Sequence, residues 1–173
     1  MIRVEDIGGV DTGWDNGSLF SNEGIKLYEL VRKLKPNVIV EVGAWVGCST
    51  SYLACAVRDN GSGKVISIDI TKGAGSQLAD ELKKFVEFRC ENALEYKPQE
   101  KIDFVFEDGA HTWGFTESIA KRYKASMCFV SHDYMHRTCQ ETVYEEFNKV
   151  LGFADEIFFE PPSDCGLGIK YFK

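Results

Sequence analysis

The order of apolar and amphipathic segments limits the fold of this chain more than any other feature. Short apolar runs rich in branched side chains alternate with segments whose apolar residues recur at helical spacing. This alternation is typical of a parallel β-sheet with helices on both faces, because each strand is then buried on two sides. The sequence predicts strands at 38–43, 64–70, 86–91, 102–107 and 126–132, and helices at 47–58, about 74–84, about 114–124 and about 139–150.

The two ends of this alternation complete the predicted fold. A preceding helix should begin at Ser21 or Asn22, either of which can cap it, and should end before Pro36. Near the carboxyl terminus, "PPSDCG" separates strand candidates at 154–160 and 167–173 and is too short for a crossover helix. These strands should form an antiparallel hairpin at a sheet edge. We therefore predict an α/β fold with a Rossmann-like, doubly wound, seven-stranded mixed sheet.

Length and composition set the domain organisation. With 173 residues and 44% apolar content, the chain can close one sizeable core, so residues 21–173 are expected to form a single domain. The predicted seven-stranded core uses most of the chain. Residues 1–20, which are rich in Gly and Asp, and the loops after the fourth and fifth strands are what remain to cover a substrate. We predict that residues 1–20 act as a lid, or that a second copy of the protein completes the pocket in a homo-oligomer.

Charge and cysteine usage restrict the partners. The formal charge of −7, with no compensating run of Lys or Arg, argues against nucleic acid. The amino terminus lacks the apolar core of a secretory signal, and no stretch approaches the length of a membrane span. The six cysteines show no paired short spacing, which favours buried free thiols. These features predict a cytoplasmic protein that acts on a small molecule and does not bind membranes.

The segment "VIVEVGAWVGCST" at 38–50 has the form of a strand, a glycine turn and a helix. Gly43 closes the strand and Gly47 opens the helix, where the absence of a side chain permits close approach of a ligand. A dinucleotide loop needs a glycine between them, but Trp45 stands there, so a nucleoside without phosphates is favoured over pyrophosphate. The alternative is a plain strand–turn–helix connection.

Asp69 ends the next strand, 26 residues after Gly43. A carboxylate at this position can accept hydrogen bonds from both hydroxyls of a ribose. Its alternative role is to cap the turn "DITKG" that follows.

Four segments in order, "VEVGAWVGCST", "VISIDI", "IDFVFEDGAHT" and "CFVSHDY", with the closing "CGLGIKYF", resemble class I S-adenosylmethionine-dependent methyltransferases over about residues 21–173. They are similar to the small-molecule O-methyltransferases, in the group related to cephalosporin-hydroxylase-like and sugar O-methyltransferases. The resemblance implies that Asp69 holds the ribose of the cofactor and that Asn92 lies near its adenine. It also implies that the methionine part is lined by Glu41, Gly43, Ala44, Trp45 and Gly47, with Ser49 near its carboxylate.

The three histidines of the chain lie just after the fourth and fifth predicted strands, together with several acids. Because neighbouring strands lie about 5 Å apart, these groups should converge at the carboxyl edge, where open α/β sheets bind ligands. Methyl transfer to a hydroxyl needs a base, for which we predict His111, with Asp108 orienting it or contacting the cofactor amine. The clustered residues are Glu107, Asp108, His111, His132, Asp133 and His136.

A divalent metal is the alternative means of activating the hydroxyl. Asp108, Asp133 and His132 could hold one, as the resemblance to sugar and catechol-type methyltransferases implies. Catechol-type enzymes have Asp-Asn after strand five, whereas this chain has His132-Asp133-Tyr134, so an oxygen-only Mg site is incomplete. Mn or Zn would suit the imidazole better.

The predicted function is S-adenosylmethionine-dependent O-methylation of a small-molecule hydroxyl. Two other functions stay open. One is a nicotinamide oxidoreductase of Rossmann type, against which the missing third glycine and the terminal hairpin argue. The other is a cofactor-binding partner subunit whose catalytic activity has lapsed.

Overall fold

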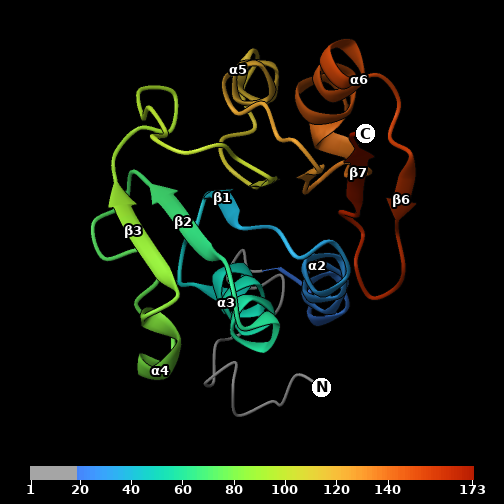
Figure 1. Cartoon of the computed structure of the whole chain (residues 1–173). Helices are drawn as coiled ribbons and strands as arrows, with labels where there is room; N and C mark the ends of the chain where they lie inside the picture. Colours follow the sequence, from blue (N-terminus) through green and yellow to red (C-terminus); the bar gives the residue numbers. More distant parts are fainter. Residues whose placement is uncertain (1–18) are drawn as a thin grey trace.

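The computed structural model describes residues 19–173, and Figure 1 shows strands with helices packed around them. The predicted lid, residues 1–20, lies outside the described residues except for Leu19 and Phe20. The seven strands form one mixed sheet, which confirms the predicted fold class.

The sheet has the strand order β3-β2-β1-β4-β5-β7-β6. The first five strands along the chain run parallel, whereas β7 is antiparallel to both β5 and β6, as the predicted hairpin requires. The strands are β1 (Val38–Val42), β2 (Lys64–Asp69), β3 (Val86–Cys90), β4 (Phe104–Glu107), β5 (Cys128–Ser131), β6 (Glu156–Phe158) and β7 (Leu167–Tyr171).

The strand register brings the carboxyl ends of four strands to one edge. Val42 of β1 lies opposite Ile68 of β2 and Glu107 of β4, and Glu107 lies opposite Ser131 of β5. The chain winds outward in opposite directions from β1 and β4, so the strand order reverses between them. Such a switch point is where open α/β sheets bind ligands.

Helices cover both faces of the sheet (Figure 1). Side chains alternate between the faces along each strand, so Ile39 packs in the core with α2 and α3, while Val40 packs in the core with α5 and α6. No described helix is both long and apolar enough to cross a bilayer. The helices are α2 (Ser21–Leu34), α3 (Cys48–Asn60), α4 (Asp80–Lys83), α5 (Phe115–Arg122) and α6 (Glu145–Leu151), the last preceded by a 3₁₀ turn η2 (Arg137–Cys139) and a π turn η3 (Gln140–Tyr144).

The helix predicted at 74–84 is much shorter than expected, because only Asp80–Lys83 is helical. The preceding residues form turns, in which Gly73 and Gly75 have φ of 85° and 75°. The backbone N–H of Gly75 donates to the carbonyl of Trp45. The segment therefore supports the glycine loop after β1 instead of extending the helix.

Helix α2 starts where predicted but is capped differently. Phe20, not Ser21 or Asn22, occupies the N-cap position, and its backbone N–H donates to Glu23 at 3.3 Å. The Asn22 amide instead donates to the carbonyl of Glu160 in the hairpin turn at 2.8 Å. Helix α2 is thus joined to the carboxyl-terminal hairpin.

Candidate functional site

A cavity of about 480 Å³ lies at the carboxyl ends of β1, β2 and β4. The described residues that line it do not include four of the predicted site residues, which are Glu41, Gly47, His132 and Asp133. The predicted residues that do line it are Gly43, Ala44, Trp45, Ser49, Asp69, Asn92, Asp108 and His111.

The glycine loop after β1 is shaped by contacts within the protein. Gly43 has a φ of 90°, and a Cβ there would lie 2.0 Å from the backbone oxygen of Asp108. Gly47, with a φ of 103°, lies directly before α3, where a Cβ would meet Gly75 at 3.1 Å. Both positions therefore exclude other residues for reasons of packing and conformation. Trp45 also has a positive φ, 45°, and its side chain is 54% exposed at the cavity wall.

Glu41 lies beneath the loop and not in the cavity wall. Its fully buried carboxylate accepts hydrogen bonds from the hydroxyls of Ser49, Thr50 and Ser67 at 2.5–2.6 Å. Burial raises the pKa of Glu41 from 4.5 to about 7, although the three hydroxyl donors oppose the rise. The predicted contact with the methionine moiety is thus replaced by a supporting role, since Glu41 holds Ser49, which does line the cavity.

Asp69 holds the loop through its backbone. One carboxylate oxygen accepts from the N–H groups of Ala44 and Trp45, both at 2.9 Å, and the other accepts from Thr71 at 2.7 Å. Burial alone would raise the pKa of Asp69, but these donors outweigh it and lower the pKa. The contact with Thr71 is the turn cap that was the alternative to ribose binding, and the cavity position leaves the carboxylate accessible to a ligand as well.

The adenine end of the predicted site is less distinctive. Asn92 lines the cavity beyond β3, together with Glu91 and Ala93. Its side-chain oxygen accepts from the backbone N–H of Leu94 at 2.9 Å. The amide nitrogen of Asn92 is thus the part of the side chain that points away from this local turn.

The ends of β4 and β5 carry a network of imidazoles and carboxylates. His132 is buried, and its Nδ1 lies 3.1 Å from Asp108 and 3.2 Å from Asp133. Its Nε2 lies 3.1 Å from Glu23, which is fully buried in α2. Burial alone would lower the pKa of His132, but the three carboxylates outweigh it and raise the pKa well above its ordinary value. His132 is therefore an imidazolium that donates from both nitrogens.

This arrangement does not fit the predicted metal site of Asp108, His132 and Asp133. A ligating imidazole must offer a lone pair, and both His132 nitrogens are engaged by carboxylates. The imidazolium also lies between the carboxylates of Asp108 and Asp133, where the ion would have to bind. His132 supplies positive charge at this point itself.

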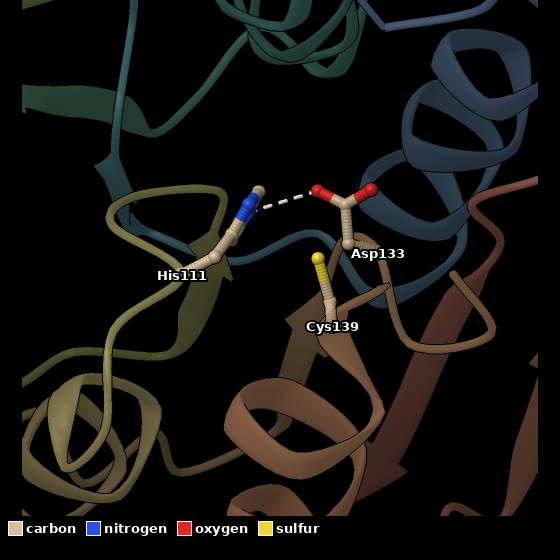
Figure 2. Close-up of side chains that lie close together, drawn as sticks. All are labelled: His111, Asp133 and Cys139. Atoms are coloured by element: carbon tan, nitrogen blue, oxygen red, sulfur yellow. Dashed lines mark ion pairs between the residues drawn. The ribbon is translucent and has the colours of Figure 1, made fainter. Parts of the chain in front are cut away.

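His111 pairs with Asp133 and not with Asp108. Its Nε2 lies 2.9 Å from Asp133 Oδ2, as the dashed line in Figure 2 marks. This hydrogen bond raises the pKa of His111, and burial only partly opposes the effect. Burial would raise the pKa of Asp133, but the two histidines outweigh it and hold that pKa well below its ordinary value. The orienting role predicted for Asp108 thus falls to Asp133.

Sequence reasoning missed two members of this network, Glu23 and Cys139. Glu23 lies four and seven residues before Leu27 and Leu30 and shares their buried face, so a carboxylate on an apolar helix face was the available signal. Cys139, whose sulfur lies beside His111 and Asp133 in Figure 2, gave no signal in the sequence.

Solved structures of methyltransferases share this fold. An O-methyltransferase of tomaymycin synthesis from Streptomyces achromogenes, solved with SAM, has a TM-score of 0.68 at 18% identity, with 90% of this chain and 82% of that chain covered. An O-methyltransferase from Bacillus cereus, solved with SAH, has a TM-score of 0.70 at 17% identity, covering 91% and 83%. The N-methyltransferase NodS from Bradyrhizobium japonicum WM9 has a TM-score of 0.63 at 14% identity, covering 87% and 93%. No curated protein matches significantly.

The strand order, the terminal hairpin and the cavity at the switch point together define a class I methyltransferase fold. A family model agrees with this assignment and covers more than half of the chain. The protein belongs to the family described as "Methyltransferase domain", whose model matches residues 40–143.

Proposed function

We propose that this protein transfers a methyl group from S-adenosylmethionine to a hydroxyl of a small molecule. The observation that carries the proposal is the cavity, which has Asp69 and Asn92 on one side and His111 on the other. The O-methyltransferases with the same fold, solved with SAM or SAH, support this choice of cofactor and reaction. When bound, S-adenosylmethionine supplies an electrophilic methyl group on a sulfonium.

Asp69 is proposed to hold the ribose through its remaining acceptor capacity. A carboxylate offers about four lone-pair sites, and the backbone donors of the loop occupy three of them. The fourth site is used by the exposed Thr71 hydroxyl, which a ribose hydroxyl can displace without cost to the loop backbone. Asp69 therefore accepts one ribose hydroxyl without loosening the loop, whereas accepting both would require it to release a backbone N–H.

His111 is proposed to be the base. In the neutral ring, Nε2–H donates to Asp133, which leaves the lone pair of Nδ1 to accept the proton of the acceptor hydroxyl. Asp133 then stabilises the positive charge that the ring gains. The raised pKa of His111 makes the imidazole a stronger base.

The proposal includes the predicted surroundings of the reaction. None of the six cysteines, all of which the structure describes, forms a disulfide, which supports a reducing compartment such as the cytoplasm. A small-molecule acceptor suits the size of the cavity, about 480 Å³. Completion of the pocket by a second copy of the chain stays part of the proposal.

Calorimetry on purified, cofactor-stripped protein tests the proposal. S-adenosylhomocysteine should bind with one-to-one stoichiometry, and NADH should not bind. Asp69→Ala should weaken S-adenosylhomocysteine binding by about tenfold or more, because a hydrogen bond to a charged group contributes about 1.5–3 kcal/mol. Asp80→Ala, which removes a fully exposed carboxylate on α4, is the matched control and should bind as the wild type does.

Binding of NADH without S-adenosylhomocysteine would replace the proposal with the oxidoreductase. Binding of S-adenosylhomocysteine without methyl transfer to any compound in a panel of hydroxyl acceptors would favour the lapsed partner subunit.

A further inference from the structure

Three side chains of different chemistry meet beside the cavity, outside the fully paired His132. His111 comes from the loop after β4, Asp133 lies two residues after the end of β5, and Cys139 ends η2 (Figure 2). One ligand atom from each lies within 4.8 Å of those of the other two. The three side chains converge although they come from separate segments of the chain.

The combination of imidazole, carboxylate and thiolate is suited to zinc. Zinc binds these groups at about 2.0–2.3 Å in tetrahedral geometry, which places ligand atoms roughly 3.3–3.8 Å apart. To reach that geometry, the 2.9 Å contact between His111 and Asp133 must open by a few tenths of an ångström, and the Cys139 sulfur, which lies within 4.8 Å of both ligand atoms, must approach them by up to about 1 Å. Three protein ligands leave a fourth position for water or another small molecule, as in catalytic zinc sites.

This cluster is better suited to bind an ion than the two neighbouring groups of His, Asp and Cys side chains. The His111 side chain is 38% exposed and lines the cavity, so an ion can reach it. The group formed by His132, Asp133 and Cys165 is buried, and His132 has no free lone pair. In the group formed by His136, Asp164 and Cys165, His136 Nδ1 already contacts the Thr138 hydroxyl at 2.8 Å.

We propose that His111, Asp133 and Cys139 form a binding site for a soft divalent cation of the zinc type. As the ion binds, the Cys139 thiol loses its proton to solvent and a metal–sulfur bond forms. His111 binds as a neutral imidazole through Nε2, which faces Asp133, so the proton of Nε2 moves to solvent and Nδ1 takes one up. The hydrogen bond from His132 to Asp133 then orients a ligating carboxylate, as outer-shell partners do in metal sites.

Binding of the ion has a consequence that rests on the proposed function. An imidazole that binds a cation through one nitrogen carries its proton on the other, so no lone pair remains to accept a proton. His111 can therefore be a metal ligand or a general base, but not both at once. We infer that a zinc-type ion stops methyl transfer that depends on His111 as base.

Titration of the full-length protein with Co²⁺ tests the site without any methyl acceptor. We expect one equivalent to give the near-ultraviolet charge-transfer band of a cobalt–thiolate bond and the visible bands of a tetrahedral ion, and Zn²⁺ to displace it. Cys139→Ser should abolish the thiolate band and weaken binding by at least about tenfold, and His111→Ala should weaken binding similarly.

Two cysteine variants serve as controls. Cys90→Ser removes an exposed thiol outside the cluster and should leave the spectrum unchanged. Cys165→Ser removes the thiol that the two neighbouring His–Asp–Cys groups share, and it should also leave the spectrum unchanged. Absence of the thiolate band in the wild type would overturn the proposal, as would its persistence in Cys139→Ser or its loss in Cys165→Ser.

Calorimetry with S-adenosylhomocysteine on the same variants separates this proposal from the proposed function. Cys139→Ser should bind S-adenosylhomocysteine as the wild type does, because Cys139 does not line the cavity among the described residues. A wild type that binds cobalt but no S-adenosylhomocysteine would keep the metal site and reject the methyltransferase proposal.

Discussion

The glycine loop after β1 and the histidine network after β4 and β5 are both held by carboxylates, but the groups that donate to those carboxylates differ. In the loop, Glu41 accepts from three hydroxyls and Asp69 accepts from three backbone N–H groups. In the network, Glu23 and Asp133 accept from imidazole nitrogens. Neutral donors fix the loop through geometry alone, whereas the network depends on charge pairs that fail when one member is removed.

The strongest test of the loop is Gly43→Ala. The new methyl group would lie 2.0 Å from the Asp108 backbone oxygen in a residue with a φ of 90°, so both overpacking and conformational strain apply. We expect a loss of about 4–5 kcal/mol in the free energy of unfolding, measured by urea denaturation. Gly73→Ala, at a φ of 85° with no atom within 4 Å, should lose only about 1 kcal/mol. Equal losses would show that packing against Asp108 does not shape the loop.

The corresponding test of the network is Glu23→Gln. The substitution removes the carboxylate from a buried pair with His132 and keeps the side-chain size, so unfolding should become easier by about 3–4 kcal/mol. Glu29→Gln on the exposed side of the same helix should change stability by less than about 0.5 kcal/mol. If the two variants are equally stable in urea denaturation, the charge pair does not hold the network together.

A smaller effect should appear in the pH dependence of stability. The pKa of Glu41 rises from 4.5 to about 7 on folding, so the folded protein binds this proton more tightly than the unfolded chain does. Stability should therefore be highest below about pH 4.5, fall by about 3 kcal/mol as the pH rises to about 7, and stay level above that as far as Glu41 is concerned.

Glu41→Gln should lack this component, and the difference between its urea unfolding curves and those of the wild type isolates it. Parallel pH profiles for the two proteins would mean that Glu41 is ionised at little cost, and the contrast with the charged network would then disappear.

The sequence predicts the sheet well because four of its strands, β1, β2, β4 and β5, are short apolar runs whose burial on both faces leaves a clear pattern. It predicts the helix at 74–84 wrongly because Gly73 and Gly75 turn the chain and direct its backbone donors to the loop. That interaction links segments about thirty residues apart, and no local pattern reports it.

The candidate site likewise contains residues that the sequence predicts and residues that it does not. Gly43, Asp69 and His111 could be predicted to line the cavity, because Gly43 and Asp69 lie at the ends of β1 and β2, His111 lies in the loop after β4, and parallel strands bring those ends together. The contacts of Glu23 and the position of Cys139 beside His111 could not be predicted, because they depend on how α2 packs beside the hairpin and how the turn after β5 folds back. The pairing of His111 with Asp133 in place of Asp108 is likewise a matter of side-chain direction, which strand assignments do not specify.

The position of Glu23 has a consequence for the order in which parts of the protein fold. Besides His132, its carboxylate contacts Ser163 and the backbone N–H of Gly166, residues 140 and 143 positions further along the chain. These contacts join segments 140 and 143 residues apart, whereas the contacts of Asp69 with Ala44 and Trp45 join segments only 25 and 24 residues apart. Because the entropic cost of closing a loop grows with its length, we expect the glycine loop to form before the histidine network as the chain folds.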